Sequence, residues 1–183
     1  APTRQSFHLI PLIEPETSRL RLRQWRPEDR APFAALNADP RVMAHFPAVL
    51  DHSASDAVAR RCETLIAERG WGFWAVERKS DGRFMGFCGL HVPAPELPFS
   101  PCVEVGWRLA FEHWGQGYAT EAARAALAAG FGPLDLMEIV SFTAVGNLRS
   151  RAVMERLEMP LAGHFVHPAL PAGHALAEHC LYR

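Results

Sequence analysis

Residues 113–122 read His113-Trp114-Gly115-Gln116-Gly117-Tyr118-Ala119-Thr120-Glu121-Ala122, so that a glycine-rich turn directly precedes an alanine-rich segment. The apolar period after the turn predicts a helix over residues 118–131, and the alternation before it predicts a strand over residues 102–109. Glycines at such a junction let the backbone approach a phosphate, and the unpaired N–H groups of the first helical turn supply donors. The stretch therefore predicts an anion-binding turn.

Two common phosphate loops fit this stretch poorly. A P-loop requires G-x-x-x-x-G-K-[ST], and the lysine is absent. A dinucleotide fingerprint has glycine where Thr120 stands and lies in an opening βαβ unit, which the flanking pattern does not show. A tight turn that needs glycine for geometry alone and an enzyme with a variant nucleotide loop remain as alternatives at this point.

Outward from the turn, the hydrophobic period predicts elements in the order β-α-α-β-β-β-α-β-α-β-β. Strands are expected over residues 17–25, 72–79, 83–91, 102–109, 138–143, 161–166 and 175–182, and helices over residues 27–37, 53–69, 118–131 and 147–157. Four prolines make residues 92–101 a stiff surface loop. Because hairpins alternate with helical crossovers, we expect an α/β fold with a mixed sheet flanked by helices.

The bulk composition narrows the class of protein. A length of 183 residues fits one domain, which we place at residues 16–183 after an N-terminal arm of residues 1–15. The formal net charge of -1 favours neither nucleic acid nor a membrane surface, and no run reaches the roughly 20 apolar residues of a membrane span. The cysteines are scattered without a C-x-x-C pair, so a disulfide framework is not predicted and a cytoplasmic location is expected.

Three blocks of residues occur in a suggestive order and spacing. They are Glu104-Val105-Gly106-Trp107-Arg108-Leu109, Trp114-Gly115-Gln116-Gly117-Tyr118-Ala119-Thr120-Glu121-Ala122, and Asn147-Leu148-Arg149-Ser150-Arg151-Ala152-Val153-Met154-Glu155-Arg156-Leu157. Together they resemble the RimJ/RimL-type branch of the GNAT acetyltransferases, from about residue 17 to the end. The resemblance implies the GNAT fold, a strongly twisted mixed sheet whose central strands splay apart around the cofactor. Glu158 and Met159 depart from it, because glycine and an aromatic residue are more typical there.

The resemblance also implies a set of ligands and binding residues. It implies acetyl-CoA as cosubstrate without a metal, and a primary amine as acceptor, on a protein N-terminus or a small molecule. Main-chain groups of Trp107 and Leu109 would contact the pantetheine arm, with Asn147 beside it. The pyrophosphate would be surrounded by Gly115, Gln116, Gly117, Tyr118, Ala119 and Thr120. The acceptor pocket would be built by the early helices, the loop at residues 92–101 and the loop at residues 164–174.

The chemistry of acyl transfer to an amine suggests two further side chains. The reaction needs a neutral amine, stabilisation of an oxyanion and a proton for the leaving thiolate, by direct attack in a ternary complex without a covalent protein intermediate. Glu104 is the candidate base; the alternative is a solvated carboxylate paired with Arg108 on the same strand face. Ser150 is the candidate proton donor; the alternative is a helix-stabilising residue beside the Asn147 cap.

Other reactive side chains suggest simpler roles. His164, His167, His174 and His179 crowd the C-terminal end, but no cysteine or acid completes a metal set, so no metal is predicted and a loop or pocket wall is expected. Cys88 is expected to be an inert core thiol. An edge strand near the C-terminus suggests a homodimer. A non-catalytic acyl-CoA-binding regulatory module remains the alternative to an enzyme.

Overall fold

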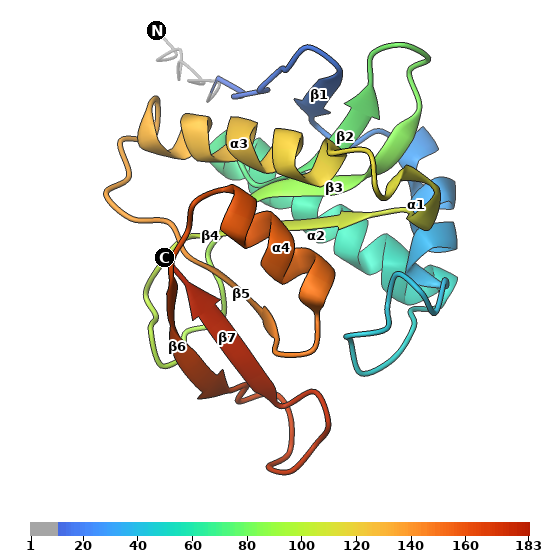
Figure 1. Cartoon of the computed structure of the whole chain (residues 1–183). Coiled ribbons are helices and arrows are strands. Elements are labelled where there is room, and N and C mark those ends of the chain that lie inside the picture. The colour runs from blue at the N-terminus through green and yellow to red at the C-terminus, as the bar shows by residue number, and fades with distance from the viewer. Residues whose placement is uncertain (1–10) are drawn as a thin grey trace, which may run out of the picture.

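The computed structural model describes residues 11–183, and its elements follow the predicted order (Figure 1). The helices are α1 (Arg30–Asn37), α2 (His52–Arg69), α3 (Tyr118–Phe131) and α4 (Leu148–Arg156), with short 3-10 turns at Pro27–Asp29 and Phe111–His113. The strands are β1 (Leu20–Arg23), β2 (Phe73–Arg78), β3 (Phe84–His91), β4 (Glu104–Leu109), β5 (Ser141–Ala144), β6 (Leu161–Val166) and β7 (Glu178–Tyr182). The predicted α/β class and the predicted order of strands and helices are confirmed.

The strands form two sheets that touch at one point. One sheet has the order β1-β2-β3-β4 and the other β5-β7-β6, and neighbouring strands within each are antiparallel. A single parallel bridge between Glu104 and Val140 joins them and gives the fold its mixed character. The Val105 N–H donates to the Val140 carbonyl at 2.8 Å, and beyond this bond β5 slants away from β4 (Figure 1). The splay leaves the outer edge of β4 open.

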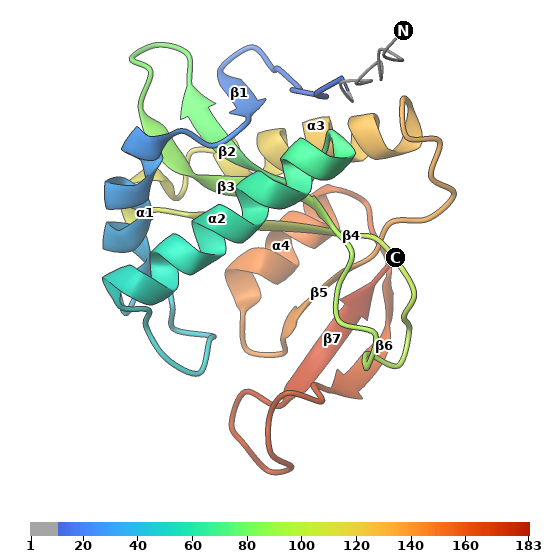
Figure 2. The ribbon, with the colours of Figure 1, turned by 180° about the vertical axis from the view of Figure 1, so that it is seen from behind.

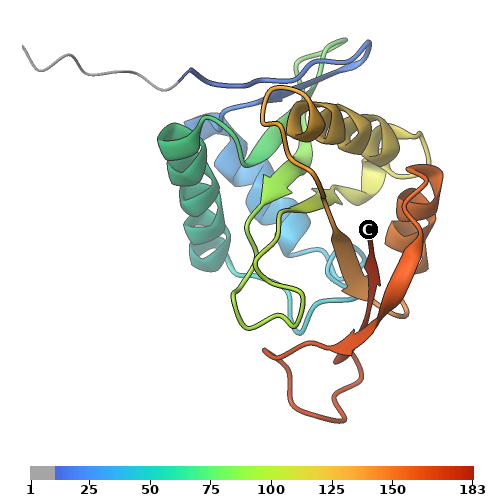
Figure 3. The same cartoon turned by 90° about the vertical axis from the view of Figure 1, so that its left-hand side faces the viewer.

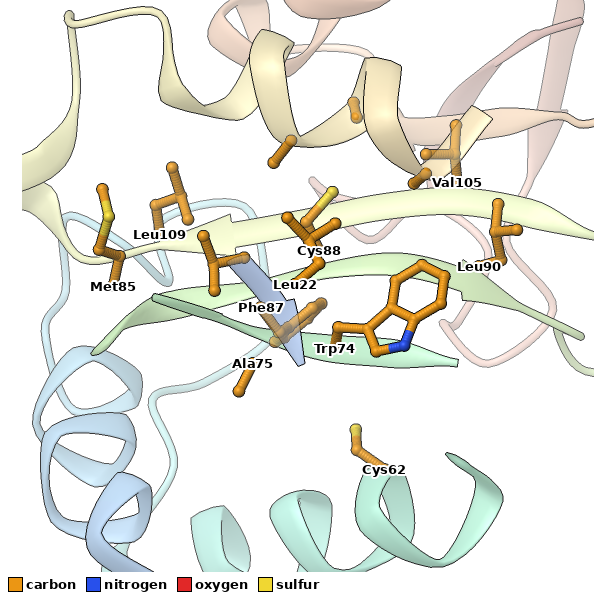
Figure 4. Packing of buried hydrophobic residues seen from close by; sticks show 14 of the residues in the cluster. Leu22, Cys62, Trp74, Ala75, Met85, Phe87, Cys88, Leu90, Val105 and Leu109 are labelled. Atoms are coloured by element: carbon orange, nitrogen blue, oxygen red, sulfur yellow. The ribbon is translucent and has the colours of Figure 1, made fainter. Parts of the chain in front are cut away.

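Helices cover both faces of the first sheet, with α1 and α2 on one face and α3 on the other (Figures 2 and 3). Side chains alternate along each strand, so Cys88, Leu90 and Val105 share the face toward α3 (Figure 4). On the opposite face Phe87 meets Phe33 of α1, with ring centroids 6.0 Å apart. Three alanines of α3 are fully buried: Ala122, Ala123 and Ala126. Their small side chains let the helix lie close against the sheet.

The start of the chain is attached to the first sheet from Ile13 onward. The Ile13 N–H donates to the Gly70 carbonyl, and the Leu22 N–H donates to the Pro15 carbonyl, both at 2.8 Å. Residues 1–10 of the predicted arm lie outside the described residues. In the range 11–183, no helix combines the length and apolar character needed to cross a bilayer.

The chain leaves α4 through a strained residue. Glu158 has a φ of 61°, in the left-handed region where a side chain is disfavoured, and the Met159 N–H donates to the Met154 carbonyl at 3.1 Å. Glu158 occupies the position at which the family resemblance expects glycine. The turn therefore forms without glycine, at a cost in backbone strain.

Replacing Glu158 by glycine is expected to stabilise the fold. Relief of the left-handed strain, less the added entropy of glycine in the unfolded chain, should raise the free energy of unfolding by roughly 0.5–1 kcal/mol. The melting temperature should rise by about 1–4 °C in a thermal scan. Glu155→Gly, inside α4, is the matched control and should lower stability by about 1 kcal/mol. A lower melting temperature for Glu158→Gly would contradict the strain argument.

Candidate functional site

One large cleft opens where β4 and β5 part. Its volume is about 1380 Å³, and it runs from the beginning of α3 to the loop between α1 and α2. Ten of the predicted site residues line it: Glu104, Trp107, Leu109, Gly115, Gly117, Tyr118, Ala119, Thr120, Asn147 and Ser150. Gln116 does not line it, because its side chain turns back to donate to the Glu112 carbonyl at 3.2 Å. The fold thus gathers three separate sequence blocks around one cavity.

The open edge of β4 offers unpaired main-chain groups to this cleft. The Val105 N–H donates to the Val140 carbonyl, and the Val105 carbonyl accepts from the Ser141 hydroxyl at 2.9 Å. Both main-chain groups of Val105 therefore point toward β5. In an antiparallel strand the main-chain groups of every second residue point to the same side. Those of Trp107 therefore face the splay, where β5 is too distant to pair with them. The Leu109 carbonyl is taken by the Trp114 indole N–H at 3.0 Å.

The glycine-rich turn presents the N-terminus of α3 to the same cleft. Gly115 and Gly117 have φ values of 74° and 79°, which glycine adopts without strain. Gly117 is the N-cap residue, and no side chain caps the helix there. The first-turn N–H groups and the positive end of the helix dipole consequently remain available for an anion.

Two arginines from other elements add positive charge beside this turn. Arg19 donates from Nη1 to the Gln116 carbonyl at 3.1 Å and from Nε to the Glu121 carboxylate at 2.7 Å. Arg149 of α4 lies over the Trp114 ring, 4.6 Å from its centroid. Both arginines line the cleft. Sequence reasoning missed them, because Arg19 stands 97 residues before Gln116 and a single arginine in a strand or helix carries no signal.

These features together fit a diphosphate joined to an extended, amide-bearing chain. The uncapped helix and Arg19 suit the negative charge, and the open edge of β4 suits an extended chain that forms main-chain hydrogen bonds. Coenzyme A has this combination of groups. The residues present therefore fit the cofactor that the sequence blocks imply.

Asn147 and Ser150 lie on the opposite wall of the cleft. The Asn147 Oδ1 caps α4 by accepting from the Ser150 N–H at 3.4 Å, and its Nδ2 donates to the Thr143 hydroxyl at 3.0 Å. The capping interaction is thus present, as one of the alternatives for this helix start expected. Contact of either side chain with a ligand stays a prediction.

Glu104 stands at the point where the two sheets separate. Burial raises the pKa of its carboxyl group to about 8. The alternative in which Glu104 pairs with Arg108 is wrong, because the Arg108 Nη1 donates to the Asn37 Oδ1 at 2.8 Å instead. A carboxyl group whose pKa lies near neutral pH, open to a cleft, suits a general base.

The strand face between Glu104 and Arg108 is aromatic. Gly106 lies between them, and a Cβ atom at this position would stand 3.1 Å from the Phe73 ring. The absence of a side chain there leaves the Phe73 ring exposed to the cleft, and Phe87 lies beside it with ring centroids 4.9 Å apart. The cleft thus extends past the open edge of β4 onto the face of the first sheet that carries Glu104, Phe73 and Arg108.

The predicted outline of the acceptor pocket is wrong in two places. The outer wall of the cleft comes from Arg41, Val42, His45 and Phe46, and neither residues 92–101 nor residues 164–174 line the cleft. The proline-rich loop instead packs on the second sheet, where the Phe99 ring lies 4.9 Å from that of Phe165. His167 and His179 pack against each other near it, at 5.0 Å. Across residues 11–183, no three His, Cys, Asp or Glu side chains are placed to hold a metal ion.

Comparison with known proteins gives a consistent result. Residues 19–160 match the family model described as "Acetyltransferase (GNAT) domain". The chain is 34% identical over 144 residues to the uncharacterized protein YkkB of Bacillus subtilis (strain 168), covering 78% of this chain and 83% of that protein. It is 33% identical over 147 residues to the FsC-acetyl coenzyme A-N(2)-transacetylase of Aspergillus fumigatus, covering 75% of this chain and 61% of that protein.

A solved structure extends the similarity to almost the whole chain. The acetyltransferase from Agrobacterium tumefaciens str. C58 superposes with a TM-score of 0.75 and is 27% identical. The match covers 98% of this chain and 99% of that one. The second sheet, which lies mostly beyond the family match, therefore has a counterpart in a relative.

Proposed function

Because this chain belongs to the GNAT acetyltransferase family and is an acetyltransferase, we propose that it transfers the acetyl group of acetyl-CoA to a primary amine. One observation carries the proposal: the open edge of β4, the uncapped N-terminus of α3 and the Glu104 carboxyl group meet in one cleft of about 1380 Å³. The first two suit the cofactor, and the third suits the removal of a proton from an amine.

Bound acetyl-CoA would supply an activated acetyl thioester. The first turn of α3 and Arg19 hold the negative charge of the diphosphate, with Gly115, Gly117, Tyr118, Ala119 and Thr120 around it. The Gln116 carbonyl holds Arg19 in place by accepting a hydrogen bond from its guanidinium group. Main-chain groups of Trp107 and Leu109 orient the extended arm, and Asn147 lies alongside.

Two side chains would handle the protons of the reaction. Glu104 accepts the proton that the amine nitrogen loses as the new C–N bond forms. Ser150 donates a proton to the sulfur as the C–S bond breaks. Both groups line the cleft, and no cysteine does so within residues 11–183. Direct transfer in a ternary complex is therefore favoured over an acyl-cysteine intermediate.

We further assign the chain to the RimJ/RimL-type branch, with residues 16–183 as one domain. The support is that the three sequence blocks of that branch meet at the cleft. The acceptor would be a protein N-terminus or a small-molecule amine. The Aspergillus relative is named for transfer to a nitrogen atom, N(2), which supports nitrogen as the acetylated atom.

The proposal also includes a cytoplasmic homodimer. Strand β6 forms the outer edge of the second sheet, and its Leu161 and Val166 are 47% and 58% exposed. An exposed apolar edge strand is a frequent site of pairing between chains. Light scattering after size exclusion would test this, and a monomer at micromolar concentration would contradict it.

The decisive experiment combines binding and turnover. Calorimetry should detect coenzyme A binding, and a panel of N-terminal peptides and small amines should release the CoA thiol from acetyl-CoA. Initial-rate plots should intersect, as a ternary-complex mechanism requires. Binding without amine-dependent thiol release would favour the binding-module alternative, and no binding to folded protein would refute the proposal.

A further inference from the structure

Arg108 is a cation in the cleft wall, and no anionic side chain among the described residues 11–183 pairs with it. Its guanidinium group lies over the rings of Phe46 and Phe87, 4.5 Å and 5.1 Å from their centroids. Its hydrogen-bond partner among residues 11–183 is the neutral Asn37 amide. Burial lowers the Arg108 pKa to about 10, so the side chain keeps its charge at neutral pH.

A second buried arginine in the same chain shows the usual arrangement. Arg23 bonds the Asp29 carboxylate at 2.8 Å and the Glu77 carboxylate at 3.2 Å, so its charge is compensated within the protein. Burying a charge is expensive unless an opposite charge or strong hydrogen bonds accompany it. Arg108 departs from this pattern at the cleft, where a ligand can reach it.

The neutral partner of Arg108 is held firmly in place. The Asn37 Nδ2 donates to the Ser55 hydroxyl at 3.0 Å, which directs the Asn37 Oδ1 toward Arg108, and both Asn37 and Ser55 are fully buried. The protein therefore orients the guanidinium group with dipoles alone. This leaves its charge available to a ligand.

Nearby titratable groups cannot serve as the missing anion. Burial raises the pKa of the Cys62 thiol, which could otherwise carry a charge that acts on Arg108, to about 11, so it is neutral. Glu104 lies four residues along β4, and its Cα is about 13 Å from that of Arg108 at the usual rise of a strand. Arg41, on the facing wall, is a cation already paired with Asp39 at 2.8 Å.

We propose that Arg108 binds a carboxylate of the acceptor whose amine is placed at Glu104. This inference rests on the proposed acetyl transfer and specifies its substrate class. The exposed Phe73 ring between the two charged side chains takes an apolar spacer. The acceptor is thus a small molecule with an amine and a carboxylate separated by an apolar group, such as a short peptide or an ω-amino acid, rather than a polyamine.

A matched pair of acceptors tests this directly. Glycyl-phenylalanine and its C-terminal amide have the same shape, but only the first carries a carboxylate. The wild-type enzyme should favour the acid over the amide in kcat/KM by roughly tenfold to a hundredfold, the range for a charge-assisted hydrogen bond. Arg108→Gln should reduce this ratio to about one. Arg83→Gln is the matched control and should keep the wild-type ratio, because Arg83 is paired with Glu112 at 3.0 Å and does not line the cleft.

A second variant covers the case in which Arg108→Gln fails to fold. Asn37→Asp places a carboxylate against Arg108 without changing the volume, and the Ser55 hydroxyl can donate to it. The Arg108 charge is then compensated inside the protein. The preference for the acid should fall to about one while the melting temperature stays near that of the wild type.

The outcomes separate this inference from the proposed function. Equal rates with acid and amide, failure to use either dipeptide, or an acid preference that survives both Arg108→Gln and Asn37→Asp would overturn the role of Arg108. Coenzyme A binding, measured by calorimetry on the same samples, reports on the proposed function. If coenzyme A binds while acid and amide react equally, only the substrate class is wrong.

Discussion

Replacement of Glu104 by glutamine is expected to lower kcat/KM by roughly 10²- to 10⁴-fold, the usual contribution of a general base. Burial raises the Glu104 pKa to about 8, so the carboxyl group can accept a proton only as the pH rises toward and above that value. Wild-type kcat/KM should therefore fall about tenfold per pH unit below pH 8 and level off above it. Thiol release followed from about pH 6 to pH 9 would show this limb, and the glutamine variant should keep only the part that comes from titration of the acceptor amine.

Stability distinguishes this effect from damage to the fold. A carboxyl group whose folded pKa is raised favours the folded state at low pH, and this stabilisation is lost as the pH rises through about 8. The glutamine variant has no such loss. The free energy of unfolding of the variant minus that of the wild type should therefore be larger at pH 9 than at pH 5. Glu138→Gln is the matched control, because Glu138 is exposed and paired with Arg183. Wild-type rates in Glu104→Gln would exclude Glu104 as the base.

Replacement of Gly117 by valine is expected to weaken coenzyme A binding by roughly 10²- to 10⁴-fold, which corresponds to two charge-assisted hydrogen bonds. The Gly117 φ of 79° is unfavourable for a β-branched residue. The turn must relax, and the first-turn N–H groups of α3 then lose their alignment. Calorimetric titration with coenzyme A measures the change.

Gly82 supplies the control for backbone strain alone. It has a φ of 70° in the turn between β2 and β3, has open space around its Cα and does not line the cleft. Gly82→Val should lower the melting temperature by a similar amount and leave coenzyme A affinity unchanged. If both variants bind coenzyme A like the wild type, the glycine turn is not the diphosphate site.

The positions of the helices and strands were largely predictable from the amino-acid sequence. The order of elements is confirmed, and the turn at residues 80–82 and the end of α2 at Gly70 lie where local residues predict them. Boundaries were less accurate. The expected helix at 27–37 divides into a 3-10 turn and α1, because Asp29 turns inward to bond Arg23. That ion pair depends on a strand that precedes the helix and could not be read from a helical pattern.

The cofactor side of the cleft was predictable in outline and the acceptor side was not. The glycine turn, the start of α3 and the alternation of β4 are each encoded by neighbouring residues, which set backbone geometry locally. The outer wall of the cleft instead comes from Arg41, Val42, His45 and Phe46, although the loops at 92–101 and 164–174 were expected to line the acceptor pocket. Nothing in the composition of those segments indicates which of them packs beside β4.

The sequence by itself determined the local backbone: a glycine turn that exposes the first N–H groups of a helix, and a strand with Glu104 and Arg108 on one face. Only the tertiary structure decided the charge state and partners of those side chains. Arg108 meets Asn37 across 71 residues, and the burial that raises the Glu104 pKa comes from several elements. Backbone conformation depends on adjacent residues, whereas solvation and charge compensation depend on whichever distant segments fold against them.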